Sequence, residues 1–149
     1  MKISKQLPQF EDEQVLLVVT GRQEAEFFRA GGGVIEKTAG FKVEKPLHDD
    51  RKGRVTRGGH GQIFASGAVY EEQKEKIMQD FRREFRNILK ILLTDFTPDK
   101  IYVYAPPYLA NGVTALFSKR AALTIKKIVK GNFYGRHPFE ILEKIRVQK

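Results

Sequence analysis

A glycine-rich basic segment at residues 51–62 holds the side chains with the clearest potential for chemistry. Its sequence, RKGRVTRGGHGQ, contains four cations, four glycines and no acid. Glycine lets backbone amides approach a phosphate closely, and arginine and lysine neutralise phosphate charge. We therefore expect nucleic acid to bind here, and a solvated surface loop is the alternative. The predicted contact residues are Arg51, Lys52, Arg54, Arg57, Gly58, Gly59, His60, Gly61 and Gln62.

A second basic block lies at residues 119–136, which carry six cations and no acid. Lys126, Lys127 and Lys130 are its members predicted to assist the first segment. The whole chain has a formal net charge of +9. This asymmetry favours a polyanionic partner, such as RNA, DNA or an acidic membrane surface, without choosing among them.

Three strands are predicted before the basic segment. Residues 1–13 look like a polar lead-in. Gly31-Gly32-Gly33 is expected to be a hairpin turn and not a phosphate loop, because neither a helix nor a Gly-Lys-Ser/Thr ending follows it. A bulge is expected at Ala39-Gly40. Apolar runs and alternation place the strands at residues 14–20, 24–30 and 34–45.

A long loop at residues 46–67 is expected to display the basic segment. The clearest helix follows at residues 69–93, with an apolar stripe at spacings of three and four. The stripe consists of Ile77, Phe81, Phe85, Ile88 and Leu92. Thr97-Pro98-Asp99 is expected to form the turn after this helix. The remaining predicted elements are strands at 100–105 and 121–130 and helices at 108–119 and 138–147.

The order of these elements predicts the topology of one α/β domain over residues 1–149. Sequential strands tend to be neighbours, and strand–helix–strand crossovers return parallel and right-handed. Three strands in a meander, followed by helix, strand, helix, strand and helix, give a five-stranded mixed sheet covered by helices. This is the succession found in ribonuclease-H-like folds.

Several chemistries are disfavoured by the residues present. Ribonuclease-H-like nucleases need an acid in the first strand to hold magnesium, and residues 15–20 contain none. His48-Asp49-Asp50 is interpreted as a polar loop and not a metal site. His137 is expected to have a capping or surface role at the start of the helix that begins at Pro138. No motif indicates a cofactor or a small-molecule ligand. Tyr70, Tyr102, Tyr104, Tyr108, Phe133 and Tyr134 are candidates for base stacking, although core packing is the stronger expectation for most of them.

The expected cellular compartment follows from features that the sequence lacks. It contains no Cys, which fits a reducing compartment. The first eight residues lack the apolar run of a signal peptide, and no stretch approaches the roughly 18–20 apolar residues needed to span a bilayer. We therefore expect a cytoplasmic protein without a transmembrane segment.

Two segments of the chain resemble the "protein required for attachment to host cells" family. One is residues 101–107 (IYVYAPP), followed by Leu109 and Leu116. The other runs from Ile128-Val129-Lys130 through the HPFEIL sequence at 137–142. That family is related to the bacterial and archaeal homologues of eukaryotic-type class-1 peptide-chain release factors. The resemblance covers most of residues 14–145 and implies a ribonuclease-H-like, release-factor middle-domain fold associated with ribosomes or tRNA.

In release factors, the corresponding loop carries a Gly-Gly-Gln tripeptide that helps water attack the peptidyl-tRNA ester. This chain has Gly58-Gly59-His60-Gly61-Gln62 there, preceded by a matching basic run. The interruption moves Gln62 two residues away from the glycine pair. Binding of a basic loop in an RNA cavity tolerates that change. Catalysis tolerates it less well, because the attacking water molecule must be positioned accurately.

Three functional hypotheses follow. The leading one is an RNA-binding factor of the translation apparatus that engages ribosomal RNA or tRNA. The second is peptidyl-tRNA ester hydrolysis, with Gln62 as the candidate catalytic residue and His60 as a helper. The third is a non-catalytic interaction domain for an acidic protein or membrane surface. The chain has no room for the codon-reading and partner-binding domains of a full release factor.

Overall fold

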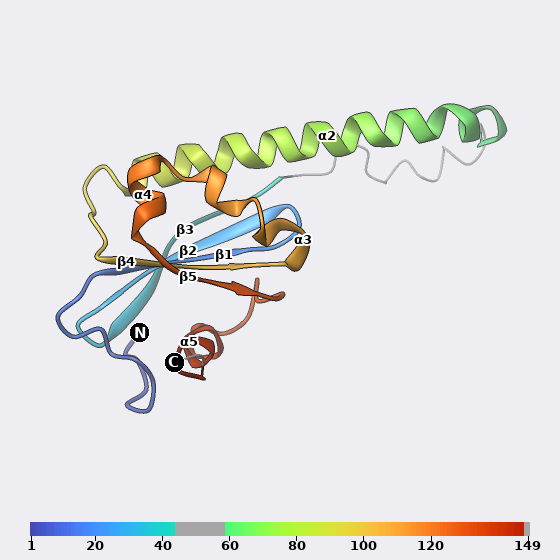
Figure 1. Cartoon of the computed structure of the whole chain (residues 1–149). Coiled ribbons are helices and arrows are strands. Elements are labelled where there is room, and N and C mark those ends of the chain that lie inside the picture. Colours follow the sequence, from blue (N-terminus) through green and yellow to red (C-terminus); the bar gives the residue numbers. More distant parts are fainter. Residues whose placement is uncertain (44–58, 148–149) are drawn as a thin grey trace.

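The computed structural model describes residues 1–43 and 59–147, and for residues 59–70 and 147 it describes the backbone alone. The fold is α/β, with a five-stranded mixed sheet in the order β3-β2-β1-β4-β5 and helices on both faces (Figure 1). The strands are β1 (Val15–Thr20), β2 (Glu24–Gly31), β3 (Val34–Lys42), β4 (Lys100–Ala105) and β5 (Ile125–Lys130). The helices are α2 (Gly59–Leu92), α3 (Pro107–Ala110), the 3-10 turn η2 (Val113–Leu116), α4 (Lys119–Thr124) and α5 (Pro138–Val147).

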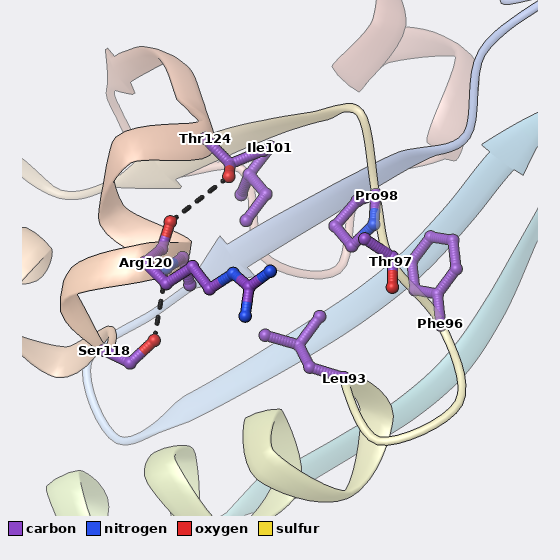
Figure 2. Close-up of a pocket in the computed structure, with 9 residues that line it drawn as sticks. Leu93, Phe96, Thr97, Pro98, Ile101, Ser118, Arg120 and Thr124 are labelled. Carbon is purple, nitrogen blue, oxygen red and sulfur yellow. Dashed lines mark hydrogen bonds between the residues drawn. The ribbon is translucent and has the colours of Figure 1, made fainter.

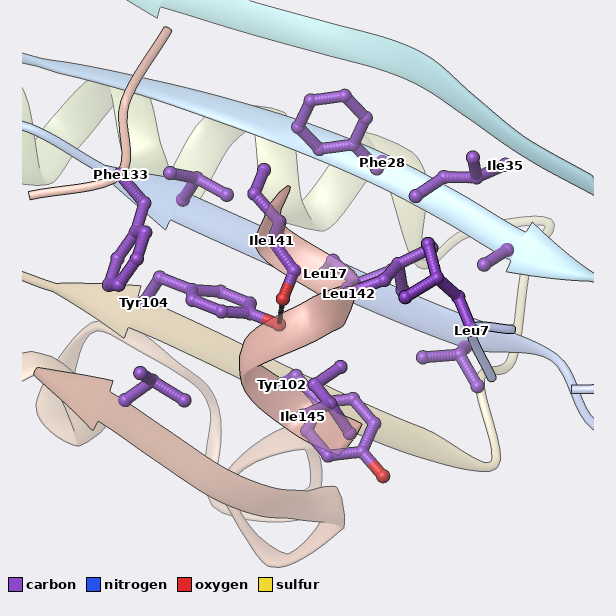
Figure 3. Packing of buried hydrophobic residues seen from close by; sticks show 14 of the residues in the cluster. Leu7, Leu17, Phe28, Ile35, Tyr102, Tyr104, Phe133, Ile141, Leu142 and Ile145 are labelled. Atoms are coloured by element: carbon purple, nitrogen blue, oxygen red, sulfur yellow. Dashed lines mark hydrogen bonds between the residues drawn. The ribbon is translucent and has the colours of Figure 1, made fainter. Parts of the chain in front are cut away.

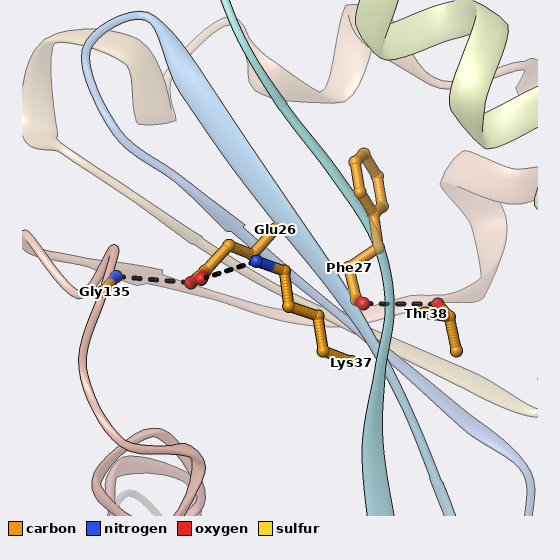
Figure 4. A network of polar contacts seen from close by, with 5 residues as sticks. All are labelled: Glu26, Phe27, Lys37, Thr38 and Gly135. Carbon is orange, nitrogen blue, oxygen red and sulfur yellow. Dashed lines mark hydrogen bonds and ion pairs between the residues drawn. The ribbon is translucent and has the colours of Figure 1, made fainter.

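The first three strands form the predicted meander, in which β2 pairs with β1 and β3 and every residue of β1 is buried. The hairpin between β2 and β3 turns on Gly32 and Gly33, whose φ angles are 57° and 79°. Both angles are positive, as a two-residue turn of this handedness requires, so the prediction of a hairpin is confirmed. The bulge lies near the predicted place: Thr38 is the extra residue on β3, and its hydroxyl donates to the Phe27 carbonyl over 3.2 Å (Figure 4).

The other two strands run parallel to β1. β4 has the predicted bounds, but the segment after it differs in two ways from the prediction. The single helix expected at 108–119 is split into α3 and η2, because Asn111 and Gly112, weak helix formers, interrupt it. The strand expected at 121–130 begins only at Ile125. Ser118 instead caps α4, its side-chain oxygen accepting the Ala121 N–H at 3.1 Å.

The helix α2 begins earlier than predicted. Residues 59–67 were expected to belong to the loop, yet they form the first turns of α2. Glycines at 59, 61 and 67 each disfavour a helix by about 1 kcal/mol, which explains the prediction of a loop. Gln62 and Ala65 favour a helix, and the long helix that follows extends back through these residues.

Two hydrophobic clusters fill the faces of the sheet. On one face, α2 and α4 cover the side chains of β1, β2 and β4, including Phe27 and Val103. On the other face, α5 packs through Ile141 and Leu142 (Figure 3). The lead-in is more than polar, because Leu7, only 9% exposed, belongs to this second cluster.

Candidate nucleic-acid interface

The predicted contact segment lies partly outside the described residues. Residues 51–58 fall there, as does His48. The rest of the segment, Gly59 to Gln62, forms the opening turn of α2. The two candidates for catalysis, His60 and Gln62, therefore lie two residues apart at the start of one helix. The first four N–H groups of an α-helix have no acceptor within the helix, so this opening can bind an anion.

The carboxyl-terminal half of α2, residues 77–92, is firmly anchored to the sheet. Phe81 and Phe85 are fully buried. The Phe85 ring lies 5.3 Å from that of Phe27 and 5.4 Å from that of Phe117, and the Phe81 ring lies 5.4 Å from that of Phe41. We call residues 77–92 the anchored half of α2.

The amino-terminal half of α2, residues 59–76, continues past the end of the sheet (Figure 1). Between residues 71 and 76 every side chain is exposed except Gln73, which is half-buried. Among the described side chains of α2, the apolar stripe that packs on the sheet begins at Ile77. We call residues 59–76 the projecting half, and its opening turn carries Gly59 to Gln62 away from the core.

The chain is also fixed where it leaves β3. The Val43 N–H donates to the Gln23 carbonyl at 2.8 Å, and the Gln23 side-chain amide donates to the Val43 carbonyl at 2.7 Å. Gln23 is nearly buried, so these bonds are shielded from water. The end of the meander is therefore held firmly up to Val43, the last described residue before Gly59.

The three lysines of β5 do not form one surface. By strand alternation Lys127 lies on the face of Val129, toward α5, and Lys130 on the face of Ile128, toward α2. Lys126 lies at the amino end of β5, about 13 Å along the strand from Lys130 at ~3.3 Å per residue. Only Lys130 stands at the carboxyl end of the parallel strands.

That carboxyl end presents exposed aromatic side chains. Tyr108, which follows β4, is 65% exposed, and Tyr134, which follows β5, is 37% exposed. Burial, and then the charges of Glu26 and Glu24, raise the pKa of the Tyr134 phenol. Exposed tyrosine rings are the side chains on which unpaired bases stack.

Glu26 fixes the loop that carries Tyr134. Its carboxylate is buried, pairs with Lys37 at 3.3 Å and accepts the Gly135 N–H at 3.2 Å (Figure 4). A carboxylate with a cation and an amide donor is satisfied without a metal ion. Glu26 therefore positions the turn after β5 and is not available as a ligand.

Of the aromatic candidates for stacking, the interior ones are confirmed as core residues. Tyr102, Tyr104 and Phe133 are each buried. Sequence reasoning gave no separate weight to Tyr108, although its position directly after Pro106-Pro107 marks the edge of a strand. The side chain of Tyr70 lies outside the described ones.

His137 has the capping role, one of the two roles predicted for it. Its Nδ1 accepts the Phe139 N–H at 3.0 Å at the start of α5. Among the described residues no three His, Asp or Glu side chains gather as a metal site would require. Within those same residues, no helix is both long and apolar enough to cross a membrane.

A small cavity lies near the carboxyl end of α2, far from the helix opening. Its volume is about 240 Å³, and Leu93, Phe96 and Ile101 contribute its apolar wall. Figure 2 shows the Arg120 side chain extending across it toward Leu93. The projecting half of α2 points away from this cavity, so the cavity does not belong to the predicted interface.

The resemblance to relatives of release factors depends on the sequence of this chain alone. No protein-family model and no curated protein matches the chain.

Proposed function

We propose that this chain is a cytoplasmic RNA-binding factor of the translation apparatus, which engages ribosomal RNA or tRNA through residues 51–62. One observation carries the proposal: the basic, glycine-rich segment leads directly into the projecting half of α2. A helix opening held away from the core can enter an RNA cavity while the sheet stays outside. Exposed Tyr108 and Lys130, at the carboxyl end of the strands, offer a further stacking and phosphate contact.

The sheet supports the same proposal. The order β3-β2-β1-β4-β5, with β1 antiparallel to β2 and parallel to β4, supports a ribonuclease-H-like fold of the release-factor middle-domain kind. The buried strand β1 carries no acid, so the magnesium-dependent nuclease chemistry of other such folds is not proposed. The resemblance of residues 101–107 and 128–142 to relatives of release factors points in the same direction.

Ribosome co-sedimentation and tRNA gel shifts over a series of salt concentrations test the proposal. Each phosphate contact contributes about one unit to the slope of log affinity against log salt. Replacing Arg54 and Arg57 together by Ala should therefore lower that slope by about two units and weaken binding at every salt concentration.

The matched control removes two cations from elsewhere on the surface. Lys2 and Lys5 are exposed and lie in the lead-in, so their replacement by Ala should leave the slope nearly unchanged. Equal loss of binding in both double variants would show that only net charge matters. Binding to anionic liposomes but not to RNA would favour the acidic-surface hypothesis instead.

Peptidyl-tRNA ester hydrolysis is the second candidate function. The observation that favours it is the position of Gly59 to Gln62 in the first turn of α2. Free N–H groups at a helix opening can stabilise the oxyanion that forms when water attacks an ester. Gln62 would orient the water, and His60 would assist.

Release of labelled peptide from peptidyl-tRNA on ribosomes tests this second function. Gln62→Ala should lower the release rate by about 10²-fold or more, as removal of a positioned polar group does. The same variant should still co-sediment with ribosomes. An unchanged release rate would reject hydrolysis while leaving the RNA-binding proposal in place.

A further inference from the structure

A large cleft opens at the amino ends of the parallel strands, on the face covered by α5. Its volume is about 730 Å³. The lead-in, the starts of β4 and β5 and the last turn of α5 form its walls. It lies at the opposite end of the sheet from Tyr108, Lys130 and the projecting half of α2. We call it the amino-end cleft.

Tyr102 gives this cleft a polar group that has no partner among the described side chains. The residue is only 6% exposed, and its hydroxyl makes no hydrogen bond within residues 1–43 and 71–146. The neighbouring Tyr104 differs, because its hydroxyl donates to the Ile141 carbonyl at 2.8 Å. Figure 3 shows the Tyr102 hydroxyl directed away from the buried side chains around it. A tyrosine hydroxyl that faces a cleft without a protein partner can bond a ligand or a water molecule there.

Phe10 supplies an aromatic wall whose backbone is strained. Its φ angle is 49°, and among the described residues it is the one non-glycine with a left-handed backbone. Such a conformation is a true outlier for a bulky residue. The Phe10 carbonyl accepts the Gly32 N–H at 2.9 Å, which fixes the strained residue against the β2–β3 turn. Its ring is held 6.3 Å from that of Tyr102, so both rings line the cleft.

The charges of the cleft are divided between its two sides. On the β5 side, Lys126 is exposed and has no ion pair within the described part of the chain. On the β1 side, Glu11 and Asp12 are exposed and likewise lack a described partner. Lys100, between them on β4, is already paired with Glu13 at 2.7 Å. The cleft thus offers a site for an anion at one side and hydrogen-bond acceptors at the other.

We propose that the amino-end cleft binds a nucleoside monophosphate unit. The base packs against the exposed part of the Phe10 ring and accepts or donates a hydrogen bond at the Tyr102 hydroxyl. The phosphate pairs with Lys126, and the ribose hydroxyls or an amino group of the base donate to Glu11 and Asp12. A nucleotide combines these three features, and the volume lies within the ordinary range of small-molecule sites.

The nucleotide has two possible sources: a free nucleotide, or the 5′-phosphorylated end of single-stranded RNA. The chemistry that the cleft recognises is the same for both. The inference goes beyond the proposed RNA interface, because the two sites lie at opposite ends of the sheet and are tested with different ligands.

Titrations of the ¹⁵N-labelled chain, followed by NMR, test the proposal with AMP, GMP, CMP and UMP. At least one of them should shift the amide signals of residues 7–13 and 100–102. Adenosine, which lacks phosphate, and ribose 5-phosphate, which lacks a base, should each bind more weakly than AMP by about tenfold. A 5′-phosphorylated trinucleotide that binds more tightly than the monophosphates identifies an RNA end, and equal affinity identifies a free nucleotide.

Variants separate specific recognition from general charge. Lys126→Ala should weaken nucleotide binding about tenfold, as loss of a charged hydrogen bond does. Tyr102→Phe keeps the ring and should weaken it severalfold. The control is Lys119→Ala, which removes an exposed cation from α4 on the other face of the sheet and should leave binding intact.

Two results would overturn the inference. One is an absence of shifts at residues 7–13 and 100–102 with all four nucleotides and the trinucleotide. The other is equal weakening by Lys126→Ala and Lys119→Ala. Thermal unfolding of each variant shows whether it is folded. Loss of ribosome binding in the Arg54 and Arg57 double variant is measured separately, so failure of either proposal leaves the other standing.

Discussion

Truncating Phe85 tests whether the anchored half of α2 alone contributes to the stability of the core. Phe85 is fully buried and its ring contacts those of Phe27, Phe81 and Phe117 at 5.3–5.9 Å. Replacing a buried Phe by Ala costs about 3–5 kcal/mol, and each lost ring pair accounts for about 0.5–1.5 kcal/mol within that range. Because a domain is typically stable by about 5–15 kcal/mol, Phe85→Ala should remove a large fraction of the total.

The matched substitution lies in the projecting half. Glu72 is exposed in a helix interior, where glycine costs about 1 kcal/mol if the helix there unfolds together with the core. We expect Glu72→Gly to leave the global unfolding midpoint unchanged, since residues 71–76 contribute no side chain to either hydrophobic cluster.

Urea unfolding followed by circular dichroism measures both variants, and hydrogen exchange reports the opening of α2 residue by residue. Phe85→Ala should lower the midpoint strongly, whereas Glu72→Gly should speed exchange only in the projecting half. The reasoning is refuted if Phe85→Ala costs less than about 1 kcal/mol, or if both variants lower the midpoint equally.

Two further predictions concern the core and a helix cap. Burial raises the pKa of the Tyr104 phenol far above its ordinary value, so the folded chain retains a proton that the unfolded chain releases above about pH 10, and stability should fall by up to ~1.4 kcal/mol per pH unit there. Tyr104→Phe should make that fall shallower and, through the lost bond to the Ile141 carbonyl, lower stability at neutral pH by about 1–3 kcal/mol, as measured by urea unfolding at pH 8 and pH 11. Ser118→Ala removes the cap that accepts the Ala121 N–H and should lower the unfolding free energy by about 0.5–2 kcal/mol, whereas Ser118→Asp should retain most of it.

The parts of the fold with strong local signals were predictable from sequence. The apolar run of β1, the strand after Thr97-Pro98-Asp99, and α5 after Pro138 all have the predicted bounds within one residue. The short elements between Pro107 and Thr124 were not, because four- to six-residue helices carry too little periodicity to be distinguished from a longer helix or a strand.

Of the two candidate sites, one could be predicted from the sequence and the other could not. The basic segment is visible because its residues are contiguous, although the helical start at Gly59 was hidden by the glycines around it. The amino-end cleft was invisible, since Phe10, Tyr102 and Lys126 are far apart in sequence and meet only through the register of the sheet. The exposure of Tyr108 likewise depends on how the chain turns after β4.

A long helix held at one end behaves as a lever. At ~1.5 Å per residue the eighteen residues from 59 to 76 extend about 27 Å beyond the point where Ile77 meets the core. A rotation of about 5° about that point would move the opening turn by about 2 Å. A slight repacking of the phenylalanines beneath α2 thus produces a larger displacement at Gly59. Substitutions in the core can therefore move the opening turn of α2 without contacting it.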